Sequence, residues 1–255
     1  MRRVLVVGIG AGDPEHLTVQ AVRALNAADV FFVMDKGDDK DDLAALRREI
    51  CDRYVEDRSY RVVETPDPPR DLRGPSYAAG VRSWHDTRAD IYERLLRDEL
   101  ADGQAGAFLV WGDPALYDST LRILDQVAAR GAVAFAVEVV PGISSVQALA
   151  AAHRVALHGI GRPVHVTTGR RLADEGWPAG VDDVVVMLDG RCAFATVEPA
   201  GVTIFWGAYL GTPDQILLSG PLADVAGEIE RVRAEARGRK GWMFDTYLLR
   251  RDGGD

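Results

Sequence analysis

The stretch VLVVGIGAGDP, residues 4–14, decides the fold class. The aliphatic run at its start indicates a short strand, and the glycines directly after it indicate a tight turn. Thr18 is placed to cap a helix that runs to about residue 28. A strand, a glycine-rich loop and a helix in this order predict the first unit of an α/β fold.

The same alternation continues along the chain. Apolar runs at 30–34, 107–111 and 133–140 fit strands, and helical patterns at 43–51, 77–100, 119–129 and 143–152 separate them. Past residue 160 the strand-like runs are shorter, at 164–168, 184–188, 202–206, 215–218 and 244–249, with one helix at 223–236. We therefore predict two α/β lobes, residues 1–115 with a mostly parallel sheet and residues 116–255 with a mixed sheet.

Composition limits the classes of partner. The chain has 255 residues and a formal net charge of −9, which argues against a nucleic-acid surface because phosphate binding needs a basic stripe. No stretch approaches the ~20 apolar residues of a membrane span, so we expect no membrane partner and a cytoplasmic location. Cys51 and Cys192 fit no metal or redox spacing, and no metal is expected.

Three loops share one placement in the predicted fold. Residues 8–14, 111–118 and 140–145 each follow an apolar strand and precede a helix. Ligands of open α/β sheets bind outside the carboxyl ends of the strands, and glycine lets bare backbone approach a ligand closely. These loops are therefore the candidate ligand site, and the alternative is a set of tight turns with no ligand.

The first loop does not match a dinucleotide fingerprint. Asp13 stands where G-x-G-x-x-G requires its third glycine, and Pro14 has no N–H to offer a phosphate. Only Asp35, at the end of the second apolar run, fits the place of a ribose-binding acid. The second loop lacks the lysine of a P-loop and carries Asp113, so a neutral or cationic ligand fits it better than an anion.

Five motifs in fixed order resemble the tetrapyrrole methylase family over nearly the whole chain. They are GIGAGDPEHLT at 8–18, VWGDPALYDST at 110–120, VPGISS at 140–145, a strand ending at Met187, and YLGTPDQ at 209–215. The resemblance implies two α/β lobes with the methyl donor S-adenosylmethionine between them, S-adenosylhomocysteine as product, and a homodimer. The sulfonium of this donor favours carbonyls and carboxylates, which accounts for aspartates in the glycine loops.

The resemblance also places donor contacts residue by residue. It puts them on Trp111, Gly112, Asp113 and Leu116 in the second loop, Ser144 and Ser145 in the third, and Met187 and Gly211 in the second lobe. Ser144 and Ser145 have an alternative role as simple helix caps.

The motif set most resembles members that methylate C-1 of precorrin-5 and release its acetyl group as acetate in cobalamin biosynthesis. Alternatives are a corrin-pathway methyltransferase without deacetylation, a donor-binding protein without turnover, and a nicotinamide-dependent oxidoreductase. Deacetylation needs a base for water, and the candidates are Asp35, His85 and Asp86. Because precorrin-5 carries many carboxylates, we also expect a basic lining that involves Arg82 and Arg88.

Overall fold

The computed structural model describes residues 1–35, 41–56, 59–69 and 77–251. The chain forms two compact units. The first contains residues 1–10 and 14–143, and the second contains residues 11–13 and the chain from Ser144 onward. Among the described residues, no helix is long and apolar enough to cross a bilayer.

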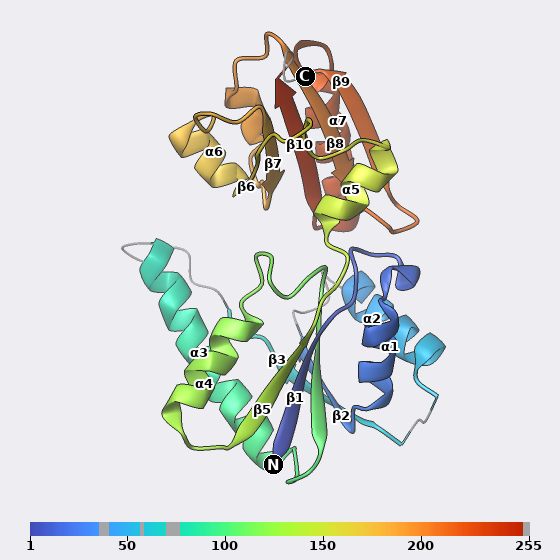
Figure 1. Ribbon diagram of the computed structural model, residues 1–255, viewed down its shortest axis with the longest axis vertical. Coiled ribbons are helices and arrows are strands. Elements are labelled where there is room, and N and C mark those ends of the chain that lie inside the picture. The colour runs from blue at the N-terminus through green and yellow to red at the C-terminus, as the bar shows by residue number, and fades with distance from the viewer. Residues whose placement is uncertain (36–40, 57–58, 70–76, 252–255) are drawn as a thin grey trace. The chain divides into compact units, whose positions relative to one another are not determined.

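The first unit is built on a parallel sheet of five strands (Figure 1). The strands are β1 (Arg2–Gly8), β2 (Val30–Asp35), β3 (Arg61–Pro66), β4 (Ala105–Val110) and β5 (Phe135–Val140). Their order in the sheet is β3-β2-β4-β1-β5, and every pair is parallel. The carboxyl ends of β4, β1 and β5 therefore lie next to one another at one edge.

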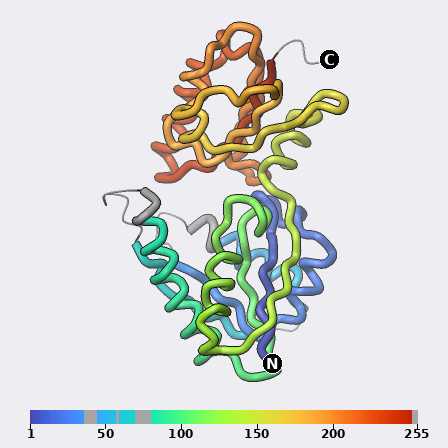
Figure 2. The backbone as a smooth tube through the Cα atoms, turned by 60° about the vertical axis from the view of Figure 1, so that its left-hand side comes forward, coloured from blue at the N-terminus to red at the C-terminus, as the bar shows by residue number. Residues whose placement is uncertain are grey.

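Helices cover both faces of this sheet because its strands carry apolar side chains on both sides. Helices α1 (Val19–Asn26) and α2 (Asp41–Tyr54) pack on the face that contains Leu5 and Phe31. Helices α3 (Tyr77–Asp98) and α4 (Thr120–Arg130) lie side by side on the other face, where the core includes Val6 and Phe108 (Figures 1 and 2).

The second unit has a mixed sheet. Its strands are β6 (Val164–Thr168), β7 (Asp183–Met187), β8 (Val202–Ala208), β9 (Ile216–Pro221) and β10 (Asp245–Arg251), in the order β6-β7-β10-β8-β9. Only the β6–β7 pair is parallel. Helix α5 (Ser145–His153) packs against β8 and β10, and α7 (Leu222–Lys240) packs against β8 and β9. The short helices are α6 (Gly169–Glu175), η1 (Pro14–His16, in the first unit) and η3 (Ala193–Thr196).

The predicted fold class is confirmed, with a parallel sheet in the first unit and a mixed sheet in the second. The predicted boundary after residue 115 differs from the compact units, which divide after Ile143. The reason is β5, which pairs with β1 over its whole length and so belongs to the first sheet. The cap predicted at Thr18 is present, since its side chain accepts from the amide of Ala21 at 3.0 Å.

Candidate functional site

The glycine loops of the first unit lie at a topological switch point of its sheet. The chain leaves β1 through α1 on one face, and it leaves the neighbouring strand β4 through α4 on the opposite face. Where two adjacent parallel strands diverge in this way, their carboxyl ends border a crevice that typically holds the ligand. The predicted contacts Trp111, Gly112 and Asp113 directly follow β4 at this point.

Four glycines let the loops pack backbone against backbone. Gly10 and Gly112 form a bridge in which the Gly112 amide donates to the Gly10 carbonyl at 2.8 Å. A Cβ on Gly8 would lie 2.6 Å from the amide nitrogen of Gly142, and a Cβ on Gly142 would overlap the Gly112 carbonyl oxygen. No side chain fits at Gly8 or Gly142 without moving backbone, so these glycines hold the loops of β1, β4 and β5 together.

Asp113 ties two of these loops with its side chain. Its Oδ1 accepts from the amide of Ala115 at 2.8 Å, and its Oδ2 accepts from the amide of Gly142 at 2.8 Å. The carboxylate thus fixes the turn after β4 and joins it to the turn after β5. This role explains why an acidic residue occupies a glycine loop.

Four amides of these loops are already engaged within the protein. Gly112 donates to Gly10, Gly10 donates to Gly112 at 3.4 Å, and Gly142 donates to Asp113. Leu116 donates to the Asp113 carbonyl at 3.2 Å. An anion nest needs several free N–H groups that point at one spot, and these four amides are not free to form one. The geometry therefore favours a ligand that is held by carbonyls and apolar contacts over a phosphate.

Replacing Asp113 by Asn should lower the free energy of unfolding by about 2 kcal/mol. Asn has one acceptor oxygen, so it can accept from only one of the two backbone amides. Its NH₂ group would then face the other donor, the N–H of Ala115 or of Gly142. Denaturant unfolding measures the change. Asp118→Asn is the matched control, because the Thr120 amide donates to Asp118 Oδ1 at 2.6 Å and Asn can keep that bond. Equal stability of the two variants would contradict the two-loop role of Asp113.

In the second unit, predicted contacts meet at one end of the mixed sheet. Met187 is the last residue of β7 and pairs with Thr246 of β10, which pairs on its other side with Gly207 of β8. The Thr246 hydroxyl donates to Ser145 Oγ at 2.9 Å, in the first turn of α5. Ser145 and Met187 are therefore neighbours through Thr246.

The other predicted contacts of the second unit have structural partners of their own. Ser144 is buried and caps α5, with Gln147 completing a capping box, so the cap role is confirmed. Gly211 donates its amide to Gln215 Oε1 at 2.9 Å. Gly12 packs against the same turn, since a Cβ there would lie 2.5 Å from the Leu210 carbonyl oxygen. This close approach accounts for the early third glycine of the first motif.

Left-handed backbone marks the same loops. Tyr117, Leu188 and Tyr209 have φ values of 53°, 53° and 50°, and each lies one or two residues from Leu116, Met187 or Gly211. A non-glycine residue in this region costs about 1–3 kcal/mol, and such strain clusters at ligand sites. Leu188 is also 58% exposed, unusual for a large apolar side chain next to a buried strand.

The predicted base Asp35 lies at the same edge of the first sheet. It ends β2, is exposed, and sits beyond Phe32, where the pairing of β2 with β4 stops. Arg47 contacts β4 near this point, since its Nε donates to the Leu109 carbonyl at 3.3 Å. Burial lowers the pKa of Arg47 below its ordinary value, although the nearby Asp118 acts in the opposite direction.

The prediction that Arg88 forms an open carboxylate lining is wrong. Arg88 is 6% exposed, its Nε donates to Asp67 Oδ1 at 2.8 Å, and its guanidinium stacks 4.4 Å from the centroid of the Trp84 ring. The buried ion pair fastens α3 to the segment after β3. His85 is half-buried in α3 beside Trp84, and Asp86 accepts from Gln126 of α4 at 2.6 Å. These two side chains belong to the helix layer.

The structure adds His16, which the sequence analysis overlooked. His16 ends η1, and a Cβ on Gly10 would lie 2.5 Å from His16 Cβ. Its Nδ1 is buried and has no hydrogen-bond partner among the described residues. A buried polar atom in that state is uncommon and calls for an explanation. The sequence signal was present, because the histidine stands inside the motif GIGAGDPEHLT.

The fold and these loops define a protein of the tetrapyrrole (corrin/porphyrin) methylase family, to which the chain belongs. The model of that family matches residues 3–226.

The chain is similar to three known proteins along nearly its whole length. The chain is 54% identical to "Precorrin-6A synthase [deacetylating]" of Sinorhizobium sp, over 98% of this chain and 96% of that protein. It is 37% identical to a crystal structure described as a cobalamin synthesis related protein (CobF) from Corynebacterium diphtheriae, with a TM-score of 0.83 over 98% and 99% of the two chains. It shares its fold with uroporphyrin-III C-methyltransferase from Thermus thermophilus complexed with S-adenyl homocysteine, at 22% identity and a TM-score of 0.59 over 97% and 91%.

Proposed function

We propose that this protein is an S-adenosylmethionine-dependent methyltransferase that acts on precorrin-5. It methylates C-1 of the macrocycle and releases the C-1 acetyl group as acetate, which gives precorrin-6A in aerobic cobalamin biosynthesis. The observation that carries the proposal is 54% identity along 98% of the chain with a protein named precorrin-6A synthase [deacetylating]. The engaged amides at Gly10, Gly112 and Gly142 support it, because they suit a cationic donor better than a phosphate.

The donor-binding residues in this proposal come from both units. They are Trp111, Gly112, Asp113, Leu116, Ser144, Ser145, Met187 and Gly211. The donor supplies a methyl group on a sulfonium. Because Asp113 and the two serines already hold loops and a helix start, we expect their backbone atoms to make most of the polar donor contacts. Methyl transfer to a neutral thioether leaving group needs little acid–base help, so positioning supplies most of the acceleration.

Removal of the acetyl group needs a base. Water loses a proton to the base and adds to the acetyl carbonyl carbon, and the bond from that carbon to C-1 then breaks. Acetate leaves, and the electron pair that remains on C-1 forms the bond to the methyl carbon. We propose His16 as the base, ahead of Asp35 and His85, because His16 packs on Gly10 and offers a buried ring nitrogen at the switch point.

Incubation with precorrin-5 and methyl-labelled donor tests the function. We expect one labelled methyl group in the product and one equivalent of free acetate per turnover. Label in the product without acetate would instead indicate a corrin-pathway methyltransferase that does not deacetylate. Calorimetry separates the remaining alternatives, since we expect micromolar affinity for S-adenosylhomocysteine and none for nicotinamide dinucleotides. Binding without turnover would indicate a donor-binding protein. We further propose a homodimer, which sedimentation analysis would test.

A further inference from the structure

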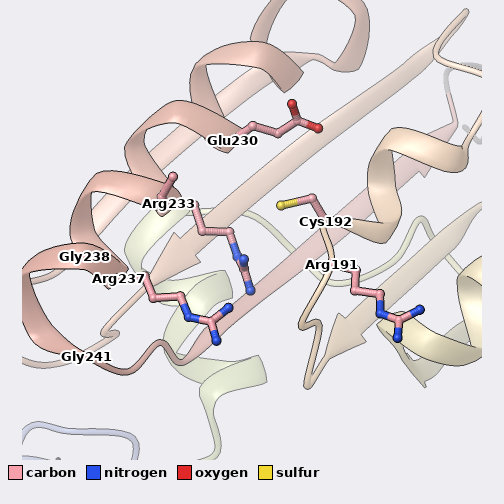
Figure 3. A pocket seen from close by; sticks show the side chains of 8 residues that line it. Arg191, Cys192, Glu230, Arg233, Arg237, Gly238 and Gly241 are labelled. Carbon is pink, nitrogen blue, oxygen red and sulfur yellow. The ribbon is translucent and has the colours of Figure 1, made fainter.

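A basic pocket of the second unit lies at the loop that follows β7, the strand that ends at Met187. It has a volume of about 670 Å³ between α7 and the loop after β7 (Figure 3). Arg191, four residues after Met187, lines one side, and Arg233 and Arg237 of α7 line the other. Pockets of this size accommodate ligand-sized groups.

Arg233 is the fixed part of the pocket. It is buried, its Nε donates to Asp245 Oδ2 at 2.8 Å, and its Nη2 donates to the Asp189 carbonyl. Burial alone would lower the pKa of Arg233, but the charge and hydrogen bond of Asp245 raise it above its ordinary value. Asp189 in turn accepts from Tyr247 Oη at 2.6 Å and from the amide of Arg191 at 2.9 Å. This buried network fixes the loop that carries Arg191.

Arg191 and Arg237 are the available charges. Both side chains are exposed, and neither has a carboxylate partner among the described residues. Some other exposed arginines of this chain do pair, as Arg231 does with Glu235 at 2.8 Å. The chain has a net charge of −9, so two arginines without carboxylate partners give this pocket a local charge that is opposite in sign to the net charge.

The other residues that line the pocket do not neutralise the guanidinium groups of Arg191 and Arg237. Figure 3 shows Glu230 at the end of the pocket away from the guanidinium groups of Arg191 and Arg237. Burial raises the pKa of the Cys192 thiol, which keeps it neutral near pH 7. Ala234 and Gly238 line the α7 side with little bulk. The pocket therefore repels a sulfonium and attracts an anion.

We propose that this pocket binds carboxylate side chains of the tetrapyrrole substrate, with Arg191 and Arg237 as the ligands. The proposal rests on the proposed function for the identity of the macrocycle. Guanidinium groups match carboxylates in a bidentate geometry, and the tetrapyrroles of this pathway carry several carboxylates each. The basic lining that the sequence placed on α3 is supplied instead by α7 and the loop after β7.

Steady-state kinetics of Arg191→Gln, Arg237→Gln and the double variant test the pocket. For each single variant we expect KM for precorrin-5 to rise about fivefold, the upper range for an exposed charge pair, and about 25-fold for the double variant if the two add. We expect kcat and the affinity for S-adenosylhomocysteine to stay within about twofold. Arg239→Gln is the control, since Arg239 is exposed in the same last turn of α7 and does not line the pocket.

Direct titration keeps the pocket test independent of the reaction. Fluorescence quenching of a porphyrin octacarboxylate should weaken in the double variant and remain unchanged in Arg239→Gln. If Arg191→Gln, Arg237→Gln and Arg239→Gln lose affinity equally, or the double variant loses none, the proposal is refuted. If inorganic phosphate displaces the bound porphyrin as effectively as a porphyrin carboxylate does, the pocket is a general anion site. That result would also refute the proposal. A wild-type enzyme that releases no acetate refutes the proposed function and leaves the titration valid.

Discussion

Gly142→Ala is expected to lower the free energy of unfolding by about 3 kcal/mol or more and to weaken S-adenosylhomocysteine binding by about 100-fold. The added Cβ would overlap the carbonyl oxygen of Gly112 and lie 2.8 Å from Gly8 Cα. Both obstacles are backbone of neighbouring strand ends, so no side-chain rotation relieves the contact. The loops after β1, β4 and β5 would have to separate, which breaks the Gly142 hydrogen bond to Asp113.

A matched glycine distinguishes local crowding from the general effect of a methyl group. Gly227 lies in α7, and a Cβ there would meet no atom within 4 Å. Gly227→Ala should therefore stabilise the protein by about 0.5–1 kcal/mol, because alanine loses less backbone entropy in a helix. Thermal unfolding and calorimetry with S-adenosylhomocysteine measure both variants. Unchanged stability and donor affinity in Gly142→Ala would refute the proposed packing of the three loops.

The sequence predicted the fold well wherever a segment is buried. The run at 30–34 matches β2, and the run at 202–206 lies within β8, because apolar runs between breakers carry a strong signal. It missed β3, an edge strand with mostly exposed or half-buried residues, and α6, which is only 7 residues long. Both lack the apolar periodicity that identifies buried elements.

For the candidate site, the sequence predicted the loops but not the partners of the charged residues. The motifs located the loops, because glycine and proline spacing is written directly in the sequence. The partners of the charged residues depend on tertiary contacts, and these are not visible in spacing. Asp113 therefore proved to be a link between loops, and Arg88 proved to be half of a buried ion pair with Asp67.

His16→Asn is expected to lower the rate of acetate release by about 10²–10⁴, the range for loss of a general base. Asn keeps the Cβ that packs near Gly10, so the loop should retain its shape, but its amide cannot take up a proton. The affinity for S-adenosylhomocysteine and the unfolding temperature should stay close to wild type. Quenched-flow measurement of acetate with precorrin-5 in excess gives the rate.

Two comparisons make the His16 test specific. His165→Asn changes an exposed histidine of β6 and should leave the rate unchanged. Asp35→Asn and His85→Asn measure the other two candidates, and we expect a smaller loss from each because neither packs on Gly10. Added imidazole should restore part of the activity of His16→Ala, which a purely structural role would not allow. A His16→Asn enzyme that keeps more than about half of the wild-type rate would assign the base to Asp35 or His85, since removal of a required base costs far more than twofold.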